Sequence, residues 1–520
     1  MQTASSADAR TVPGILRLGA QGCPDRLAVV SRNGVGITYR DLLVRGIRRG
    51  RGLLDLGLAQ GDRVAAWMED STEYIEVYVA CALAGLVVVP VNARYTEHEA
   101  RRILEDSGSR VLVFSGVVAA RAAAVAAAIP SLVLVGTSAS PAAHRLFADL
   151  VPAGSDDSLP DPAADHLFIV GYTSGTTGPP KGAMLTHGSV ATLARMNALA
   201  YRLPVGSVAA MTGSMSFVAV VPAHVFSHFY VRGTVHVLGP WNVESLLSVI
   251  ERHRVTFTYI PSPLLEEFAA AAAKDPARWQ SLETVLHSAS KAPVAKLRAL
   301  ADVVGHRLVE GLGMTENSGG LVTATTPSDV FSGPGPSDPL RTVGRAVPEV
   351  EIRLVDAAGV ALPHDGTTVG ELVFSSPALM AGYWHHPIET AEVLRDGWYH
   401  SGDLGTIDPE GYVEIHERRS DLIVSGGMNV YPYEVEECIS RLPGVAACAV
   451  VGLPHERWGQ SVVAAVVRAP GSDLDANAVI EHCQAYLASY KKPTRVIFVE
   501  DLPTTTSLKV SRQGVRDLLS

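Results

Sequence analysis

The stretch YTSGTTGPPK, Tyr172 to Lys181, is the most informative part of the sequence, and it directly follows the apolar run Leu167 to Val170. It combines glycines, hydroxyl side chains and one lysine in a short loop. Glycines let backbone N–H groups approach an anion, hydroxyls add donors, and the lysine adds positive charge. The loop is therefore predicted to hold a polyphosphate. The residues expected to contact it are Thr173, Ser174, Gly175, Thr176, Thr177, Gly178 and Lys181.

A second cluster is EGLGMTE, residues 310–316, in which a glycine-rich turn ends in a carboxylate. A carboxylate near phosphates is a natural Mg²⁺ ligand, because this ion prefers oxygen donors. Taken alone, such a turn is more often a structural loop, and its weight comes from the other clusters. The residues predicted to line the phosphate-containing site are Glu310, Gly311, Leu312, Gly313, Met314, Thr315 and Glu316.

Two further segments contain candidate site residues. In WYHSGDLG, residues 398–405, Asp403 follows a turn glycine, where its carboxylate could accept hydrogen bonds from a ribose diol or simply cap the turn. Lys509 lies in a polar tail near the C-terminus, a setting in which a lysine is ordinarily solvated.

Composition limits the class of protein. The chain has 520 residues, of which 47% are hydrophobic and 18% charged, and its formal net charge is −10. Such a chain is expected to form several packed units, and dispersed positive residues disfavour nucleic-acid binding. The five cysteines show no disulfide or zinc spacing and fit a reducing cytoplasm. We expect no signal peptide and no membrane insertion, because the apolar runs are too short.

Strand-like and helix-like segments alternate through the first four hundred residues, which favours α/β layers with mainly parallel sheets. Predicted buried strands include residues 63–68, 86–91, 110–114, 131–136, 234–239 and 256–260, and predicted helices 97–106 and 243–253. From Val343 shorter strands and turns suggest an antiparallel β subdomain. After residue 419 the pattern changes to a small α+β unit. Its expected helices are 432–441 and 474–490, and its expected strands 446–451 and 462–468.

In this order and at these separations, the four elements resemble the adenylate-forming superfamily, which contains AMP-dependent acid–CoA ligases (acyl-CoA synthetases), luciferases and peptide-synthetase adenylation domains. Further segments carry the resemblance: ITYRDL (37–42), VVVPVNARYT (87–96), GELVFSSPALMAGYW (370–384) and DLIVSGGMNVYPYEVEECI (421–439). The resemblance implies an N-terminal domain, residues 1–419, of two α/β subdomains and a β-barrel. A small mobile α+β domain, residues 420–520, would follow.

The resemblance also implies a two-step reaction. A carboxylate and ATP, with Mg²⁺, give acyl-AMP and pyrophosphate, and a thiol, usually coenzyme A, then displaces AMP. By position, Thr315 would contact the α-phosphate, Glu316 would hold Mg²⁺, and Asp403 and Arg418 would bind the ribose. Lys509 would stabilise charge in the first step. After domain rotation, the turn with Ser425, Gly426 and Gly427 would guide pantetheine.

Several positions depart from the family pattern. Leu312 stands where an aromatic residue usually contacts adenine, and Leu508 replaces the glycine before the catalytic lysine. Ser420 occupies the hinge position. The residues expected to contact the acid are Phe217, Val221, His224, Ser290, Lys291 and Ala292. Lys291 could pair with a polar group of the acid, although we favour solvent. No acidic residue stands in these segments to hold an ammonium group.

We therefore expect an acyl-CoA ligase that activates a hydrophobic, bulky acid, with the acid and coenzyme A as its small-molecule partners. One alternative is an enzyme that adenylates weakly and mainly thioesterifies a preformed acyl-AMP, because Leu312 and Leu508 alter the nucleotide side. Another is loading of a separate carrier protein. A catalytically silent binding protein is disfavoured by the presence of all the charged site residues. A homodimer is left open.

Overall fold

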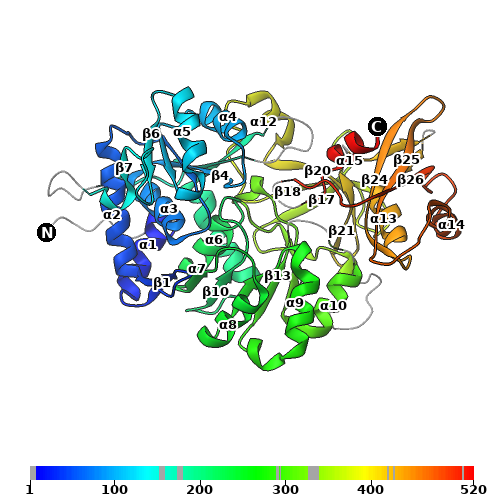
Figure 1. Ribbon diagram of the computed structural model, residues 1–520, viewed down its shortest axis with the longest axis horizontal. Helices are drawn as coiled ribbons and strands as arrows, with labels where there is room; N and C mark the ends of the chain where they lie inside the picture. The colour runs from blue at the N-terminus through cyan, green and yellow to red at the C-terminus, as the bar shows by residue number, and fades with distance from the viewer. Residues whose placement is uncertain are drawn as a thin grey trace.

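The computed structural model describes residues 8–151, 159–172, 180–288, 292, 294–325, 339–418, 421–425, 428–505 and 509–520, without the side chains of residues 263, 417, 418 and 429. In Figure 1 a large α/β body carries the N-terminus and a smaller lobe carries the C-terminus. Antiparallel strands lie between them. The fold is therefore mixed α/β with a large N-terminal part and a small C-terminal part, as the sequence predicts.

The first sheet of the body has the strand order β7-β6-β5-β3-β4-β8-β9, and its strands pair in parallel except for β9 on β8. Strands such as Val87–Val91 are buried along their whole length, as parallel strands covered on both faces should be. The strands are β3 (Arg63–Trp67), β4 (Val87–Val91), β5 (Val111–Phe114), β6 (Val133–Gly136), β7 (Arg145–Leu146), β8 (Leu167–Tyr172) and β9 (Gly182–Thr186).

The second sheet has the order β14-β13-β12-β10-β11-β1-β2, and here β2 on β1 is the antiparallel pair. Its parallel part ends at the cleft described below. The strands are β1 (Leu27–Val30), β2 (Gly36–Thr38), β10 (Val208–Met211), β11 (Thr234–Val237), β12 (Phe257–Tyr259), β13 (Thr284–His287) and β14 (Leu308–Glu310).

One hydrophobic cluster joins the two sheets, and it includes residues of five helices. These are α1 (Val12–Gly22), α2 (Tyr39–Asp55), α3 (Thr72–Ala84), α6 (His187–Ala200) and α7 (Phe226–Tyr230). Helix α3 is buried from Tyr74 through Ala84, which its mostly apolar sequence explains; the buried Glu76 in this stretch pairs with Arg45 of α2. The outer faces of the sheets are covered by α4 (Glu97–Ser107), α5 (Ala119–Ala128), α8 (Val243–His253), α9 (Leu265–Lys274) and α10 (Val294–Val304).

An antiparallel sheet follows, in the order β17-β18-β20-β19, with β21 on β20. Its strands are β17 (Glu351–Val355), β18 (Gly370–Ser375), β19 (Leu394–Arg395), β20 (Trp398–Ile407) and β21 (Val413–Arg418). Helix α12 (Pro387–Val393) lies before β19, and the short strands β15 (Thr323–Ala324) and β16 (Arg345–Ala346) pair with each other. This sheet confirms the predicted antiparallel subdomain.

The C-terminal lobe has its own sheet, in the order β23-β22-β25-β24, with β26 parallel to β25. The strands are β22 (Ile423–Ser425), β23 (Met428–Val430), β24 (Val445–His455), β25 (Gly459–Arg468) and β26 (Arg495–Val499), and the helices are α13 (Pro432–Ser440), α14 (Ala476–Tyr486) and α15 (Arg512–Leu519). Arg341 of the body contacts Glu437 of α13, with 3.1 Å between Nη2 and Oε2.

Element boundaries differ from the sequence expectation mainly in this lobe. The predicted helix 474–490 begins at Ala476, because the Asp475 carboxylate accepts the Ala478 N–H at 2.8 Å and caps it, and it ends at Tyr486 before the extended Leu487. The predicted strand 446–451 continues to His455 in β24, where it pairs with β25. In the body, the helix predicted at 243–253 is confirmed at both ends.

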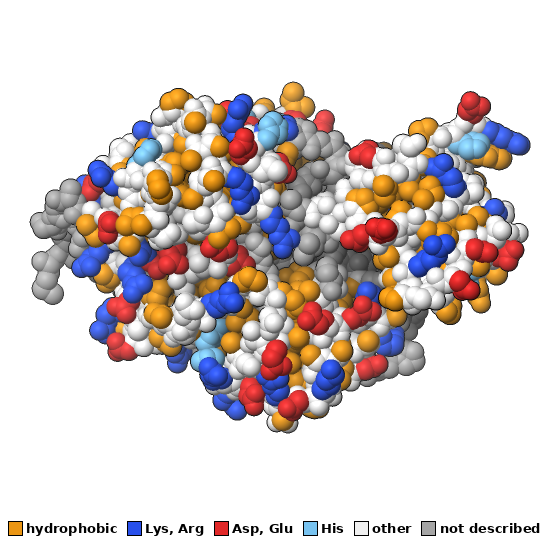
Figure 2. Space-filling view, viewed as in Figure 1, with side chains coloured by type: hydrophobic (Ala, Val, Ile, Leu, Met, Phe, Trp, Pro, Cys, Tyr) orange, Lys and Arg blue, Asp and Glu red, His pale blue; other side chains and the backbone are white. Residues whose placement is uncertain are grey.

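Charged side chains of both signs are mixed over the face of the molecule seen in Figure 2. Among the described residues, no helix is both long enough and apolar enough to cross a membrane.

Candidate active site

A cleft of about 3610 Å³ runs between the two parallel sheets, the antiparallel strands and the C-terminal lobe. It brings together side chains that are far apart in the chain. Lys181, Thr315, Glu316, Asp403 and Lys509 all line it. Open parallel sheets commonly bind ligands where their strands end, and strands β10, β12 and β14 end at this cleft. The cleft is therefore the candidate active site.

The glycine-rich turn after β14 packs closely on the segment that follows it. A Cβ atom at Gly311 would lie 2.6 Å from the Thr323 carbonyl oxygen, which excludes a side chain there. Leu312 N donates to Thr323 Oγ1 at 3.2 Å, and Leu312 O accepts the Val322 N–H at 2.7 Å. This pairing fixes the turn on the cleft wall, where residues 310–316 all line the cavity.

Glu316, the predicted Mg²⁺ ligand, is held by a tyrosine that is not among the predicted site residues. Tyr383 Oη donates to Glu316 Oε1 at 2.8 Å, and Lys181 Nζ lies 5.6 Å from the centre of the Tyr383 ring. Tyr383 thus joins the end of the phosphate-binding stretch to the candidate metal ligand. Its place in the GYW triplet at 382–384 gives no local sign of this role.

Asp403 lies in β20 and is 5% exposed. Its cross-strand partner is Arg418 of β21, so the two residues predicted to bind ribose are neighbours in the backbone register. The preceding Gly402 has φ +70°, a conformation that favours glycine, and its N–H donates to Glu371 Oε1 at 3.1 Å. The side chain of Arg418 lies outside the described part of the chain.

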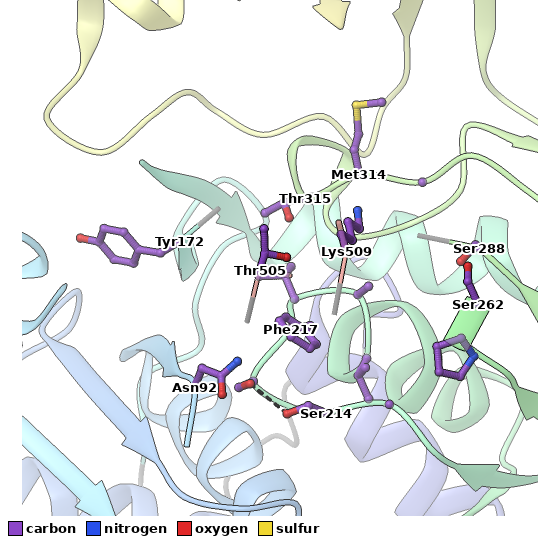
Figure 3. A pocket seen from close by; sticks show the side chains of 18 of the residues that line it. Asn92, Tyr172, Ser214, Phe217, Ser262, Ser288, Met314, Thr315, Thr505 and Lys509 are labelled. Carbon is purple, nitrogen blue, oxygen red and sulfur yellow. Dashed lines mark hydrogen bonds between the residues drawn. The ribbon is translucent and has the colours of Figure 1, made fainter. Parts of the chain in front are cut away.

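Lys509 reaches the cleft from the C-terminal lobe. Its carbonyl oxygen accepts the Thr505 N–H at 2.7 Å, and Thr504 and Val510 form a bridge beside it. Figure 3 shows Lys509, Thr505 and Thr315 in one part of the cavity. The fold therefore brings the tail lysine to the predicted phosphate site, whereas its position in the sequence suggests solvent.

The residues predicted to contact the acid divide into two groups. Phe217 and His224 line the cleft. Val221 is fully buried in the core shared by the two sheets, and Ala292 is 1% exposed in the core under α9 and α10. Neither is among the residues that line the cavity, whereas Val218 and Val220 are. This wall of the cleft is thus made by two of the predicted residues, Phe217 and His224, together with neighbours of Val221.

His224 forms an aromatic wall with Tyr201 and Tyr259. Its ring centre lies 5.5 Å from that of Tyr259, with the rings nearly parallel, and 5.6 Å from that of Tyr201. Burial, together with the neighbouring His228, lowers the pKa of His224 to about 3. The imidazole is therefore neutral at physiological pH and acts as a flat aromatic surface.

Asp70 adds an acidic group that the sequence did not place in this region. Its Oδ1 accepts the Met215 N–H at 2.7 Å, across 145 residues of chain, and lies 3.5 Å from Ser214 Oγ. Burial raises the pKa of Asp70 to about 6. The residue follows β3 of the other sheet, so no local pattern relates it to the loop at 214–217.

Glu310 is predicted as a nucleotide-side residue, and its carboxylate contacts a histidine. Glu310 Oε2 and His287 Nδ1 form a short hydrogen bond, and His287 Nε2 lies 2.8 Å from Ser262 Oγ. Glu310 and Ser262 line the cleft, and His287 lies behind them with no exposed surface. Neither Ser262 nor His287 belongs to a motif that marks a site in the sequence.

Several predicted residues lie outside the described part of the chain. They are Thr173, Ser174, Gly175, Thr176, Thr177, Gly178, Ser290, Lys291, Gly426, Gly427, Ser420 and Leu508. Ser425, the predicted pantetheine contact, ends β22 and is not among the described residues that line the cleft.

The donors in the cleft suit a nucleotide with Mg²⁺. Mg²⁺ is commonly held by one or two carboxylates together with substrate phosphates. Glu316 supplies one carboxylate, positioned by Tyr383, and the hydroxyl of Thr315 and the amines of Lys181 and Lys509 suit phosphate oxygens. In the described ranges, no three or more His, Cys, Asp or Glu side chains form a metal-binding group.

Comparison with known proteins gives matches over nearly the whole chain. The family model of AMP-binding enzymes matches residues 16–384, and that of the AMP-binding enzyme C-terminal domain matches residues 434–509. A feruloyl-CoA synthase of an Amycolatopsis species is 36% identical over 494 residues, which are 94% of this chain and 95% of the relative. A fatty acid–[acyl-carrier-protein] ligase, ScoC of Streptomyces coeruleorubidus, is 33% identical over 96% of this chain and 94% of the relative.

A solved structure also matches nearly the whole chain. The crystal structure of ATP-bound MatB from Rhodopseudomonas palustris superposes with a TM-score of 0.86 at 30% sequence identity. The match covers 97% of this chain and 98% of that one.

Proposed function

The chain belongs to the family of AMP-binding enzymes, and we propose that it is an acyl-CoA ligase that activates a hydrophobic carboxylic acid as its acyl-AMP and transfers the acyl group to coenzyme A. Its broader class, acid–thiol ligase, is that of the feruloyl-CoA synthase it resembles. The observation that carries the proposal is the meeting of Thr315, Glu316, Asp403 and Lys509 in one cleft.

In the first step, a carboxylate oxygen of the acid attacks the α-phosphorus of ATP and pyrophosphate leaves. Lys509, which enters beside Thr315, stabilises the negative charge that develops on the carboxylate and α-phosphate oxygens. Asp403 and Arg418 hold the ribose, and the loop at 173–181 holds the β- and γ-phosphates. Glu316 would hold Mg²⁺, which when bound would neutralise phosphate charge.

In the second step, the coenzyme A sulfur attacks the acyl carbon and AMP leaves. We propose that the C-terminal lobe, residues 420–520, rotates about the joint near Ser420 relative to residues 1–419. This motion withdraws Lys509 and presents the hairpin between β22 and β23, which carries Ser425, Gly426 and Gly427, to pantetheine. Among the described residues, those of β22 and β23 do not line the cleft in the present arrangement, which fits an enzyme poised for the first step.

The hydrophobic nature of the acid is supported by the wall that would receive it. Phe217, Val218, Val220, Tyr259 and the neutral ring of His224 line that side of the cavity. Apolar and aromatic groups favour a ring or a branched apolar chain over acetate, because burial of apolar area supplies most of the binding energy. We place the enzyme in the cytoplasm, which suits five free cysteines and the supply of ATP and coenzyme A.

Two alternatives each have a specific observation behind them. Leu312 offers adenine an aliphatic contact where stacking is usual, which favours an enzyme that mainly thioesterifies a preformed acyl-AMP. The similarity to an acyl-carrier-protein ligase favours a carrier protein as acceptor.

One experiment separates these activities. A panel of carboxylic acids and their synthetic adenylates is incubated with coenzyme A or a phosphopantetheinylated carrier protein, and the thioesters are measured by mass spectrometry. ATP–pyrophosphate exchange is measured with each free acid. Exchange together with CoA-ester formation from the same acid supports the proposal. Thioester formation from adenylates without exchange would replace it by the first alternative, and carrier-specific transfer by the second.

A further inference from the structure

Lys509 lies on a loop, between Pro503 and Ser511, whose two arms are hydrogen-bonded to each other. The Ser511 N–H donates to the Pro503 carbonyl oxygen at 2.8 Å, and the Thr505 N–H donates to the Lys509 carbonyl oxygen at 2.7 Å. Paired arms restrict the loop, so the position of its base decides where Lys509 enters the cleft. We call this segment the Lys509 loop.

Arg512 directly follows the Lys509 loop and begins α15. Its guanidinium donates to both carboxylate oxygens of Glu436, with 3.1 Å between Nη2 and Oε2, and Nη1 also donates to the Val450 carbonyl oxygen at 2.7 Å. Glu436 Oε1 in turn accepts the Val450 N–H at 2.7 Å. Arg512 and Glu436 thus bind both backbone groups of Val450 in β24. We call this arrangement the Arg512–Glu436 clamp.

The clamp fixes one side of the loop base and apolar packing fixes the other. The side chains of Arg512 and Glu436 are only 18% and 19% exposed. A planar guanidinium that meets a carboxylate with two hydrogen bonds sets the geometry of the pair. Leu502, before the loop, and Val515, after it, share a hydrophobic cluster with Val451 of β24. The base of the loop is therefore held against α13 and β24.

The same helix is tied to the start of the lobe. Arg516 Nη2 donates to Asp421 Oδ1 at 2.8 Å, and Arg512 Nε lies 3.9 Å from Asp421 Oδ2. Asp421 follows Ser420, near which we propose the joint between the lobe and the body. A rotation at this joint would therefore carry the Lys509 loop and the rest of the lobe together.

A fixed base matters because Lys509 must be placed accurately. A displacement of about 1 Å at a reacting centre can cost about 10²-fold in rate. A lysine side chain is flexible, so the backbone that carries it has to supply the constraint. Arg512 and Glu436 also line the cleft, which makes direct contact with the nucleotide the competing role.

We propose that Arg512, held by Glu436 and Val450, is a positioning residue that sets the place of Lys509 in the cleft and so serves the adenylation step. Arg512 acts through Lys509 and does not touch the substrate. This inference rests on the proposed function, because it takes Lys509 as the group that stabilises the adenylation transition state.

Arg512→Ala removes the clamp. We expect it to lower kcat for acid-dependent ATP–pyrophosphate exchange about 10-fold or more and to change KM for ATP little, because Lys509 acts in the transition state. Thioester formation from synthetic acyl-AMP should stay within about 2-fold of the wild-type rate. Arg512→Lys keeps the charge without the planar fork and should recover only part of the exchange rate.

Arg468→Ala is the matched control and should leave both half-reactions unchanged. Arg468 also donates to a backbone carbonyl oxygen of the lobe, that of Leu474, at 2.7 Å, and it is not among the described residues that line the cleft.

Two further measurements separate positioning of Lys509 from general support of the fold. In a Lys509→Ala background, Arg512→Ala should have almost no further effect on pyrophosphate exchange, because the residue through which it acts is absent. Hydrogen–deuterium exchange followed by mass spectrometry should be faster at the Thr505 and Ser511 amides in Arg512→Ala than in the wild type. Thermal unfolding shows whether the variant is folded.

Each opposing outcome overturns the inference. A raised KM for ATP at unchanged kcat would mean that Arg512 contacts the nucleotide. An equal loss in both half-reactions, a full further loss in the Lys509→Ala background, or unchanged amide exchange in the Lys509 loop would also contradict positioning. If the wild type shows no pyrophosphate exchange with any acid, yet Arg512→Ala still speeds amide exchange in this loop, the proposed function fails and the clamp stands.

Discussion

Tyr383 donates a hydrogen bond of 2.8 Å to the Glu316 carboxylate, and the two residues lie 67 positions apart in the chain. The bond links the loop before α12 to the turn that ends the glycine-rich segment. It removes rotational freedom from Glu316, the carboxylate that we propose as the Mg²⁺ ligand. Ligand carboxylates in metal sites are commonly oriented in this way by a second side chain.

Loss of this bond should weaken the use of Mg·ATP. We expect Tyr383→Phe to lower kcat/KM for ATP by about 10-fold and to raise the Mg²⁺ concentration needed for half-maximal rate. Calorimetric titration with Mg·ATP, in the absence of acid, gives a readout independent of turnover. Tyr230→Phe, outside the cleft, is the control. Unchanged Mg²⁺ dependence would remove Tyr383 from this role.

Lys509 should matter for the first half-reaction and not the second. Lys509→Ala is expected to lower acid-dependent pyrophosphate exchange by about 10²-fold or more, because it removes the charge that stabilises the adenylation transition state. Thioester formation from synthetic acyl-AMP should stay close to the wild-type rate. Lys492→Ala, a lysine of the same lobe outside the cleft lining, controls for effects on folding. An equal loss in both half-reactions would contradict the assignment.

The buried charge of Asp70 should lower the free energy of unfolding at neutral pH. Burial raises its pKa from the usual 3.8 to about 6, so above pH 6 the folded protein holds a charge that the unfolded chain carries more easily. Asp70→Asn keeps an oxygen to accept the Met215 N–H and removes the charge. We expect it to raise the unfolding free energy by about 2 kcal/mol at pH 8 and by almost nothing at pH 4.

Urea unfolding at these two pH values checks the Asp70 prediction. The exposed Asp302→Asn is the control and should show little difference between them. A stabilisation by Asp70→Asn that is equal at pH 4 and pH 8 would show that its charge is not the cause.

The buried ring of His224 should lower the free energy of unfolding as the pH falls. Burial and the neighbouring His228 lower the pKa of His224 from 6.5 to about 3. Between pH 6.5 and pH 3 this residue therefore binds a proton in the unfolded chain but not in the folded protein. Stability is therefore lost as the pH falls below 6.5. Among the described residues, His224 Nδ1 has no hydrogen-bond partner. Replacement of the imidazole by a phenyl ring therefore breaks no hydrogen bond at Nδ1.

We expect His224→Phe to lose about 2 kcal/mol less unfolding free energy than the wild type between pH 7.5 and pH 4.5. Thermal and urea unfolding at both pH values measure this, with the exposed His306→Gln as the control. Parallel pH profiles for His224→Phe and the wild type would mean that His224 does not supply this lability.

Many of the helices and strands could be predicted from the sequence, because the patterns that specify them are local. The run VVVPV predicts a strand buried on both faces, and it forms β4 in the first parallel sheet. The apolar spacing of residues 243–253 predicts a helix, and α8 has the same bounds; in the structure the Asn242 side chain caps its first turn. The boundaries of β24 and α14 were less accurate, because strand pairing and a single cap decide them.

Only part of the candidate active site could be predicted from the sequence. Local motifs marked Glu316 and Asp403, and the family resemblance added Thr315 and Lys509; all four line the cleft. Val221 and Ala292 were chosen by their position near the acid pocket, but a shift of one or a few residues turns a side chain from cavity to core, and both are buried. The parts at 173–179 and 289–291 lie outside the described residues, and their roles remain predictions.

The sequence by itself determined the family and the chemistry of the nucleotide side, because phosphate binding relies on short stretches of glycine, hydroxyl and charge that keep their order in the chain. Only the tertiary structure placed Tyr383 on Glu316, Asp70 on the Met215 N–H, and Ser262 in line with His287 and Glu310. Each of these contacts joins residues of different elements, and the register of parallel strands and the packing of loops fix them. The phosphate-binding motif indicates the family, and the strand ends of the second sheet line the part of the cleft where we propose that the acid binds.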